Sequence, residues 1–187
     1  MVTIGKVSGD VMLNEGNIYG DMVMHNYSKK QENIYDKSTN LQDCYEYDIA
    51  FSYASEQEQF VLRVAKLLDE MGIKVFVKPF HEQKFLAKDL HRETYKMYGI
   101  NCRFVACFIS KEYWKKEIPR HEFSVAINRM KKEKRICIIP VMMDETRPTS
   151  LDSSIVYIDA SSNDIIEMDV ASMMESIVLE DRKEQRD

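Results

Sequence analysis

The chain has 187 residues, of which 44% are hydrophobic and 30% are charged, and its formal net charge is −5 at pH 7. This length suffices for one well-packed domain with a small appendage, whereas two full domains would be crowded. The negative net charge disfavours nucleic-acid binding, and no apolar run approaches the roughly 20 residues that a membrane span requires. Since the first residues also lack the apolar core of a secretory signal, we expect a soluble, cytoplasmic protein without a membrane partner.

The four cysteines, Cys44, Cys102, Cys107 and Cys137, have no CxxC spacing. Three of them fall within apolar runs that are typical of buried strands. We therefore expect small core residues there, and neither a disulfide framework nor a metal site. The basic run at 131–135 is interpreted as the solvated end of a helix rather than as a nucleic-acid contact.

Residues 1–28 differ from the rest of the chain, because they hold most of the glycines and contain a short repeat. GKVSGDV at 5–11 returns as GNIYGDM at 16–22, and apolar residues alternate around both copies. This pattern predicts short strands separated by glycine turns, which cannot bury a core alone. We interpret 1–28 as an assembly element; a glycine-rich leader that repeats by chance is the alternative. The polar residues 29–43 are typical of a linker.

From residue 45 the chain alternates between strand and helix signals. Apolar runs predict strands at 47–54, 74–77, 104–110, 136–141 and 155–158, and amphipathic patterns predict helices at 55–71, 86–98, 119–132 and 164–180. Ser55 and Glu58 have the spacing of a capping box, and Gly72 is placed to end the first helix in a left-handed conformation. This order predicts an α/β fold: a flavodoxin-like, doubly wound, parallel five-stranded sheet. Such sheets bind ligands at the carboxyl ends of their strands.

Several familiar sites are absent from these strand ends. No GxGxxG follows the first strand, no GxxxxGK[ST] occurs, and no GxSxG elbow is present. The strand ends SYAS and ISKE lack the aspartate that a phospho-acceptor receiver domain requires. A dinucleotide cradle of the Rossmann type, a P-loop and a serine hydrolase are therefore excluded.

Glu122 is the main candidate for a catalytic residue. Pro119 suits the first helical position, which predicts that Glu122 lies in the first turn of its helix, near the carboxyl edge of the sheet. A carboxylate there can also serve only to complement the helix dipole, a role worth about 0.3–1 kcal/mol. The residues alone leave both interpretations open.

Four stretches resemble, in the right order, the TIR (Toll/interleukin-1 receptor/resistance) domain family in its bacterial form. YDIAFSYASEQ resembles the first box of the family, and GIKVFVKPFHEQKFLAKDL resembles its second strand with the BB loop that follows. CRFVACFISKEYWKKEIPRHEF is similar to the segment that carries the catalytic glutamate of enzymatic members, and RICIIPVMMDE to the next core strand. The resemblance covers about residues 45–180, and a charged tail follows at 181–187.

The resemblance implies that Glu122 is catalytic and that the substrate is NAD, cleaved between nicotinamide and ribose. It also implies nucleotide contacts from Ser52, Tyr53 and Ala54, at the end of the first strand. Tyr53 can stack on a base, or it can be a half-buried packing residue.

The family further places Phe80, Lys84 and Leu86 on the BB loop, which borders the NAD cleft and contacts neighbouring domains. Lys84 can attract a phosphate, although a single loop lysine is more often only solvated. Enzymatic members often carry a tryptophan four residues before the glutamate. Here that position is Ile118, and Trp114 lies eight residues before Glu122, so both are candidate pocket residues. His121 points about 100° away from Glu122 around the helix, which argues against a direct role.

One carboxylate suits this reaction, because the positively charged nicotinamide leaves without being protonated. A fixed anion stabilises the oxocarbenium-like ribose that remains. NAD is thus a substrate, and we expect no cofactor and no metal. The product can be ADP-ribose, a cyclic form or a conjugate. The resemblance implies a bacterial immune effector or signal producer that acts as a homo-oligomer. A non-catalytic TIR adaptor that mediates homotypic association is the alternative, and a nucleoside deoxyribosyltransferase-like enzyme fits less of the pattern.

Overall fold

A computed structural model describes residues 45–78, 89–162 and 165–185 of the chain. All of them belong to one unit, residues 41–187. The predicted assembly element at 1–28 and the linker at 29–43 lie outside the described residues. So do three of the candidate site residues, Phe80, Lys84 and Leu86.

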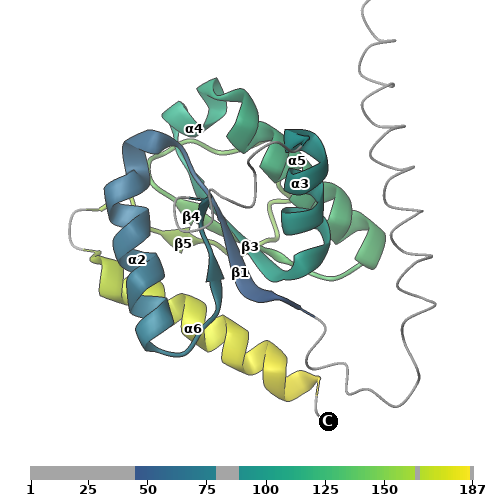
Figure 1. Ribbon diagram of the computed structural model, residues 1–187. Helices are drawn as coiled ribbons and strands as arrows, with labels where there is room; N and C mark the ends of the chain where they lie inside the picture. Colours follow the sequence, from purple (N-terminus) through teal and green to yellow (C-terminus); the bar gives the residue numbers. More distant parts are fainter. Residues whose placement is uncertain (1–44, 79–88, 163–164, 186–187) are drawn as a thin grey trace, which may run out of the picture. The chain divides into compact units, whose positions relative to one another are not determined.

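Five parallel strands form one sheet in the order β2-β1-β3-β4-β5 (Figure 1). They are β1 (Tyr47–Ser52), β2 (Val75–Phe76), β3 (Cys102–Ile109), β4 (Ile138–Met142) and β5 (Ile158–Asp159). β1 and β3 are buried along their whole length, because they lie inside the sheet and helices cover both faces. The predicted doubly wound five-stranded parallel sheet is confirmed.

The helices form a layer on each face of this sheet. α2 (Glu58–Glu70) and α6 (Glu167–Glu184) cover one face; α3 (Leu90–Lys96), the π-helical turn η4 (Met97–Asn101), α4 (Lys111–Lys115) and α5 (Glu117–Glu133) cover the other (Figure 1). Along β3, Phe104 and Phe108 pack toward α2 and α6, while the intervening Val105 and Cys107 pack toward the second layer. This alternation follows from the two-residue period of a strand.

The three cysteines within the described residues, Cys102, Cys107 and Cys137, are buried and free, as the sequence predicts. Burial raises the pKa of the Cys102 thiol to about 11, so it remains a neutral thiol at physiological pH. Gly72 ends α2 with φ of 81°, which confirms the predicted left-handed cap. Among the described residues, no helix has both the length and the apolar character that crossing a bilayer requires.

The predicted capping box at Ser55 and Glu58 is wrong. A 3-10 turn, η2 (Ser55–Gln57), precedes α2, and Ala54 stands at its N-cap without a side-chain hydrogen bond. The hydroxyl of Ser55 instead accepts a hydrogen bond from the ammonium group of Lys116, which lies between α4 and α5. A hydrogen bond to Lys116, which is distant in the sequence, thus replaces the local capping interaction that the spacing of Ser55 and Glu58 predicts.

The start of α5 also differs from the prediction. The helix begins at Glu117, so Pro119 occupies the third helical position and Glu122 lies in the second turn, not the first. The segment before it is not a loop, because Ser110 caps α4 by accepting a hydrogen bond from the backbone of Tyr113. Proline is tolerated at the third position, since the first four N–H groups of a helix have no partner within it.

Other boundaries differ by a few residues. The helix predicted at 86–98 is described from Leu90 and passes into η4. The strand predicted at 155–158 is reduced to Ile158–Asp159. The last helix begins at Glu167 and continues to Glu184, so part of the predicted charged tail is helical.

Candidate active site

Glu122 lies at the carboxyl edge of the sheet, close to the ends of β1 and β2. Its side chain is only 2% exposed, although it carries an ionisable carboxyl group. The hydroxyl of Ser52, the last residue of β1, donates a hydrogen bond of 2.7 Å to Oε2. The ammonium group of Lys78, two residues after β2, forms an ion pair with Oε1. Each carboxylate oxygen therefore has a defined partner, one at the end of β1 and one just after β2.

Two buried tyrosines fix the surroundings of this carboxylate. The hydroxyl of Tyr113 in α4 lies 2.7 Å from Ser52 Oγ and donates to the carbonyl oxygen of Pro119 at 2.9 Å. Tyr98 in η4 donates to the backbone carbonyl of Phe51 at 2.9 Å. These bonds connect β1, α4 and α5, so the position of Glu122 is held by buried and hydrogen-bonded groups.

A pocket of about 250 Å³ opens next to the carboxylate. The side chains that line it come from the end of β1, the start of α2, the residue after β2, η4 and α5: Phe51, Tyr53, Ser55, Glu58, Lys78, Tyr98 and Glu122. The pocket thus lies at the carboxyl ends of the strands, where doubly wound sheets bind ligands.

Burial is the main influence on the protonation of Glu122. Removal from water raises the pKa of its carboxyl group above the ordinary value, and the Lys78 charge and the hydrogen bonds from Lys78 and Ser52 oppose this rise. Burial also raises the pKa of Tyr53, and the charges of Glu58 and Glu122 add to that effect. The site therefore combines one carboxylate of raised pKa with a neutral phenol, a pattern found at functional sites.

A raised pKa makes Glu122 a cost to stability once it ionises. The folded state holds its proton more tightly than the unfolded chain does, so stability falls as the pH rises from the ordinary glutamate pKa through the folded value. We expect Glu122→Gln, which cannot ionise, to melt at a higher temperature than the wild type at about pH 8. Thermal melts between about pH 4 and pH 8 measure the difference. The difference in melting temperature between the two proteins should become smaller as the pH is lowered. A difference that is larger at acid pH would contradict a raised pKa of Glu122.

The candidate residues at the end of the first strand are brought to this site. Ser52 contacts Glu122 directly, and Tyr53 lines the pocket. Ala54 is fully buried and packs with the core on the α4–α5 side. Their contact with a nucleotide stays a prediction.

The two candidates before Glu122 lie elsewhere. The Trp114 ring packs against Phe123 and Tyr113, with centroid distances of 5.2 and 5.6 Å, and does not line the described pocket. Ile118 is 44% exposed and is also absent from the lining. A substrate contact by either residue stays a prediction. His121 turns toward His91 in α3, with 3.3 Å between Nε2 and Nδ1.

Sequence reasoning missed Lys78, Tyr98, Tyr113 and Glu58. Lys78 and Glu122 are 44 positions apart in the chain, and no local pattern pairs them. Tyr113 and Tyr98 follow no motif either, although aromatic residues with a polar group are commonly hydrogen-bonded when buried. The predicted parallel sheet could have indicated Lys78, since parallel neighbouring strands bring the residues that follow β1 and β2 to the same edge of the sheet.

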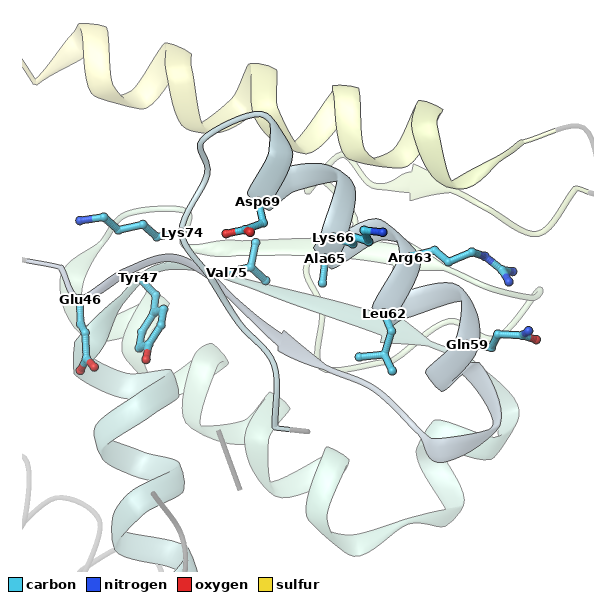
Figure 2. Close-up of a pocket in the computed structure, with 10 residues that line it drawn as sticks. All are labelled: Glu46, Tyr47, Gln59, Leu62, Arg63, Ala65, Lys66, Asp69, Lys74 and Val75. Atoms are coloured by element: carbon cyan, nitrogen blue, oxygen red, sulfur yellow. The ribbon is translucent and has the colours of Figure 1, made fainter. Parts of the chain in front are cut away.

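A second and larger hollow, of about 780 Å³, lies along the edge strand β2 and below α2 (Figure 2). Figure 2 shows Leu62, Ala65 and Val75 on its walls, with charged side chains from α2 and from the residues just before β1 and β2 around them. It contains none of the candidate catalytic residues. Within the described part of the chain, no group of three or more histidine, cysteine or acidic side chains could hold a metal ion.

Fold and site together define a class: a flavodoxin-like α/β domain with one buried carboxylate at the carboxyl edge of its parallel sheet. A model of the TIR domain family matches residues 49–174. The match covers more than half of the chain, and the chain therefore belongs to the TIR domain family.

Two curated relatives match part of the chain. The 3' cyclic ADP-D-ribose synthase AaTIR of Aquimarina amphilecti is 35% identical over 115 residues, which are 62% of this chain and 35% of that protein. The NAD(+) hydrolase TirS of Staphylococcus aureus (strain MSSA476) is 33% identical over 108 residues, 56% of this chain and 37% of that protein. This chain thus matches about a third of the length of both relatives.

A solved structure has the same fold. It is the TIR domain of the Toll-related receptor TRR-2 from Hydra magnipapillata, with a TM-score of 0.54 and 19% identity, covering 73% of this chain and 98% of that domain. At this identity the likeness concerns the fold alone.

Proposed function

We propose that this protein cleaves the bond between nicotinamide and ribose in NAD, with Glu122 as the catalytic residue. The observation that carries the proposal is a carboxylate that is 2% exposed and lines a pocket at the carboxyl edge of the sheet. A buried charge is costly and is retained mainly where a function needs it. The names of the two curated relatives, a cyclic ADP-ribose synthase and an NAD hydrolase, support the same reaction.

The chemistry of the bond explains why one carboxylate is enough. Nicotinamide leaves as a neutral molecule when the glycosidic bond breaks, because its ring is already cationic, and no general acid is required. Positive charge then develops on the ribose, and a fixed anion in a partly dry pocket stabilises it. Glu122 has the position for this role, since the buried hydroxyl of Ser52 donates a hydrogen bond to it.

The pocket has room for one end of the substrate. Its volume of about 250 Å³ is slightly below the range of ~300–1,000 Å³ for drug-sized ligands, so we place the nicotinamide and its ribose there. Tyr53 lies on the same wall and can stack on an aromatic ring. Attack by water on the ribose gives ADP-ribose, and attack by the adenine of the same molecule gives a cyclic product. No cofactor or metal is required for either.

We further propose a cytoplasmic role in bacterial immune defence or signalling, with activity that depends on assembly into a homo-oligomer through TIR surfaces and residues 1–28. Nucleic acid and membranes are not needed for this role. The second candidate function is a non-catalytic TIR adaptor. It has no need of a buried carboxylate, so the burial of Glu122 favours the enzyme.

The test is to incubate the concentrated protein with NAD and to follow nicotinamide by liquid chromatography. We expect nicotinamide to appear together with ADP-ribose or a cyclic form, and the second product distinguishes hydrolase from cyclase. Absence of nicotinamide at every protein concentration, including conditions in which light scattering shows oligomers, would favour the adaptor.

A further inference from the structure

Lys78 is the cationic residue of the pocket lining, and the reaction described above assigns it no role. It follows β2, its side chain is 30% exposed, and it forms the ion pair with Glu122 Oε1. Both residues line the same pocket, so the ion pair stands where the substrate is proposed to bind. Among the described residues, Lys78 is the one cation paired with this carboxylate.

The remaining charged and titratable groups around the pair do not replace this cation. Tyr53, Tyr98 and Tyr113 surround Glu122 as neutral phenols, and Cys107 of β3 is a neutral thiol, because burial raises the pKa of each. Glu58 of α2 adds a further negative charge to the pocket.

On α5, burial and the neighbouring His91 lower the pKa of His121, and the Lys78 charge acts in the same direction. His121 is therefore neutral in most molecules at physiological pH. Without Lys78, the Glu122 carboxylate would be a buried anion with no cation beside it among the residues that the structure describes, which favours protonation.

We propose that Lys78 is a positioning residue, which keeps the Glu122 carboxylate ionised in the empty pocket and is displaced from it by the cationic nicotinamide end of the substrate. The displacement of Lys78 by the substrate rests on the proposed function, whereas the effect of Lys78 on the empty pocket does not. An ammonium group left at Oε1 would repel both the nicotinamide ring and the positive charge that develops on the ribose. The ion pair must therefore open before the reaction, and the substrate cation supplies the replacing charge.

The test compares Lys78→Met with the conservative Lys78→Arg across a range of pH. In Lys78→Met the acid limb of the kcat/KM profile, which reports the free enzyme, is expected to move to higher pH by about 1–3 units, because an opposite charge next to a carboxyl group lowers its pKa by that amount. Lys78→Arg keeps the wild-type limb. At pH values above the acid limbs of both proteins, we expect the kcat of Lys78→Met to be at least that of the wild type, since no cation competes with the substrate at Oε1. A lower kcat at every pH with an unmoved limb would show a merely structural role and overturn the proposal.

Lys116→Met is the matched control. Lys116 has a side-chain exposure of 33%, similar to that of Lys78, and its ion pair is with Glu56, not with Glu122. Its removal should leave the acid limb in place; a shift equal to that of Lys78→Met would overturn the proposal, because any lost lysine would then suffice.

A measurement without substrate separates this inference from the proposed function. The Glu122 carboxyl carbon is titrated by ¹³C NMR in the wild type and in Lys78→Met, and Glu122→Gln identifies its signal. A higher midpoint in Lys78→Met supports the role of Lys78 even where NAD is not cleaved, in which case the proposed function alone fails. An unchanged midpoint overturns the inference, whatever the activity.

Discussion

Glu122→Gln is expected to lower the rate of nicotinamide release from NAD by about 10²–10³-fold or more, the loss typical of a removed electrostatic contact to the transition state. Glutamine has nearly the same volume as glutamate and can still accept a hydrogen bond from Ser52. It lacks the negative charge that opposes the positive charge on the ribose. The variant therefore removes the chemistry while leaving the packing of α5 in place.

The measurement is the initial rate of nicotinamide release at saturating NAD, with Glu117→Gln as the control. Glu117 is exposed in the first turn of α5, so the same chemical change on the same helix should leave the rate nearly unchanged. Thermal melts exclude unfolding as the cause, because the Glu122 variant is expected to be at least as stable as the wild type. Comparable rates for Glu122→Gln and the wild type would contradict the catalytic assignment.

Asp181→Ala is expected to destabilise the fold by about 3 kcal/mol, because it removes a partner of a buried arginine. Arg103 in β3 is 2% exposed, and its Nη1 lies 2.5 Å from Asp181 Oδ2 in α6. Asp181 also binds Arg135 at 2.9 Å. We choose the lower end of the range for a broken buried pair, since Asp181 is 15% exposed and Asp48 remains 3.9 Å from Arg103.

Chemical denaturation and thermal melts measure this loss, which corresponds to a decrease in Tm of roughly 6–12 °C for a chain of this size. Glu112→Ala is the control, because it breaks an ion pair in which Lys115 and Glu112 are 58% and 40% exposed. Exposed pairs contribute about 0–1 kcal/mol, so its Tm should hardly change. Equal losses in the two variants would show that the Arg103 pair is no more important than a surface one.

The sequence determined the class of fold, because a parallel sheet covered on both faces leaves local signals. The run FVACFI is apolar at every position since β3 is buried on both sides. The alternation with amphipathic helices predicted the topology, and Gly72 predicted the end of α2 through its tolerance of positive φ. These features depend on neighbours in the chain, and they are readable without coordinates.

The sequence also identified Glu122 as the candidate acid, but through a family resemblance and with the wrong helical position. The resemblance indicates which residue corresponds to the catalytic glutamate of enzymatic TIR domains, but it does not indicate how deeply the carboxylate is buried. Where α5 begins depends on the residues before it, since Ser110 caps the short helix α4 and Lys116 stands at the N-cap of α5.

Only the tertiary structure decided what surrounds that carboxylate. Ser52, Lys78 and Tyr113 come from three elements, and their side chains meet because β1 lies between β2 and β3 with all three strands parallel. The partners of Glu122 are 70 and 44 positions away in the chain. Local periodicity acts over a few residues, whereas the ionisation of a buried carboxylate depends on whichever charges the fold brings within a few ångströms.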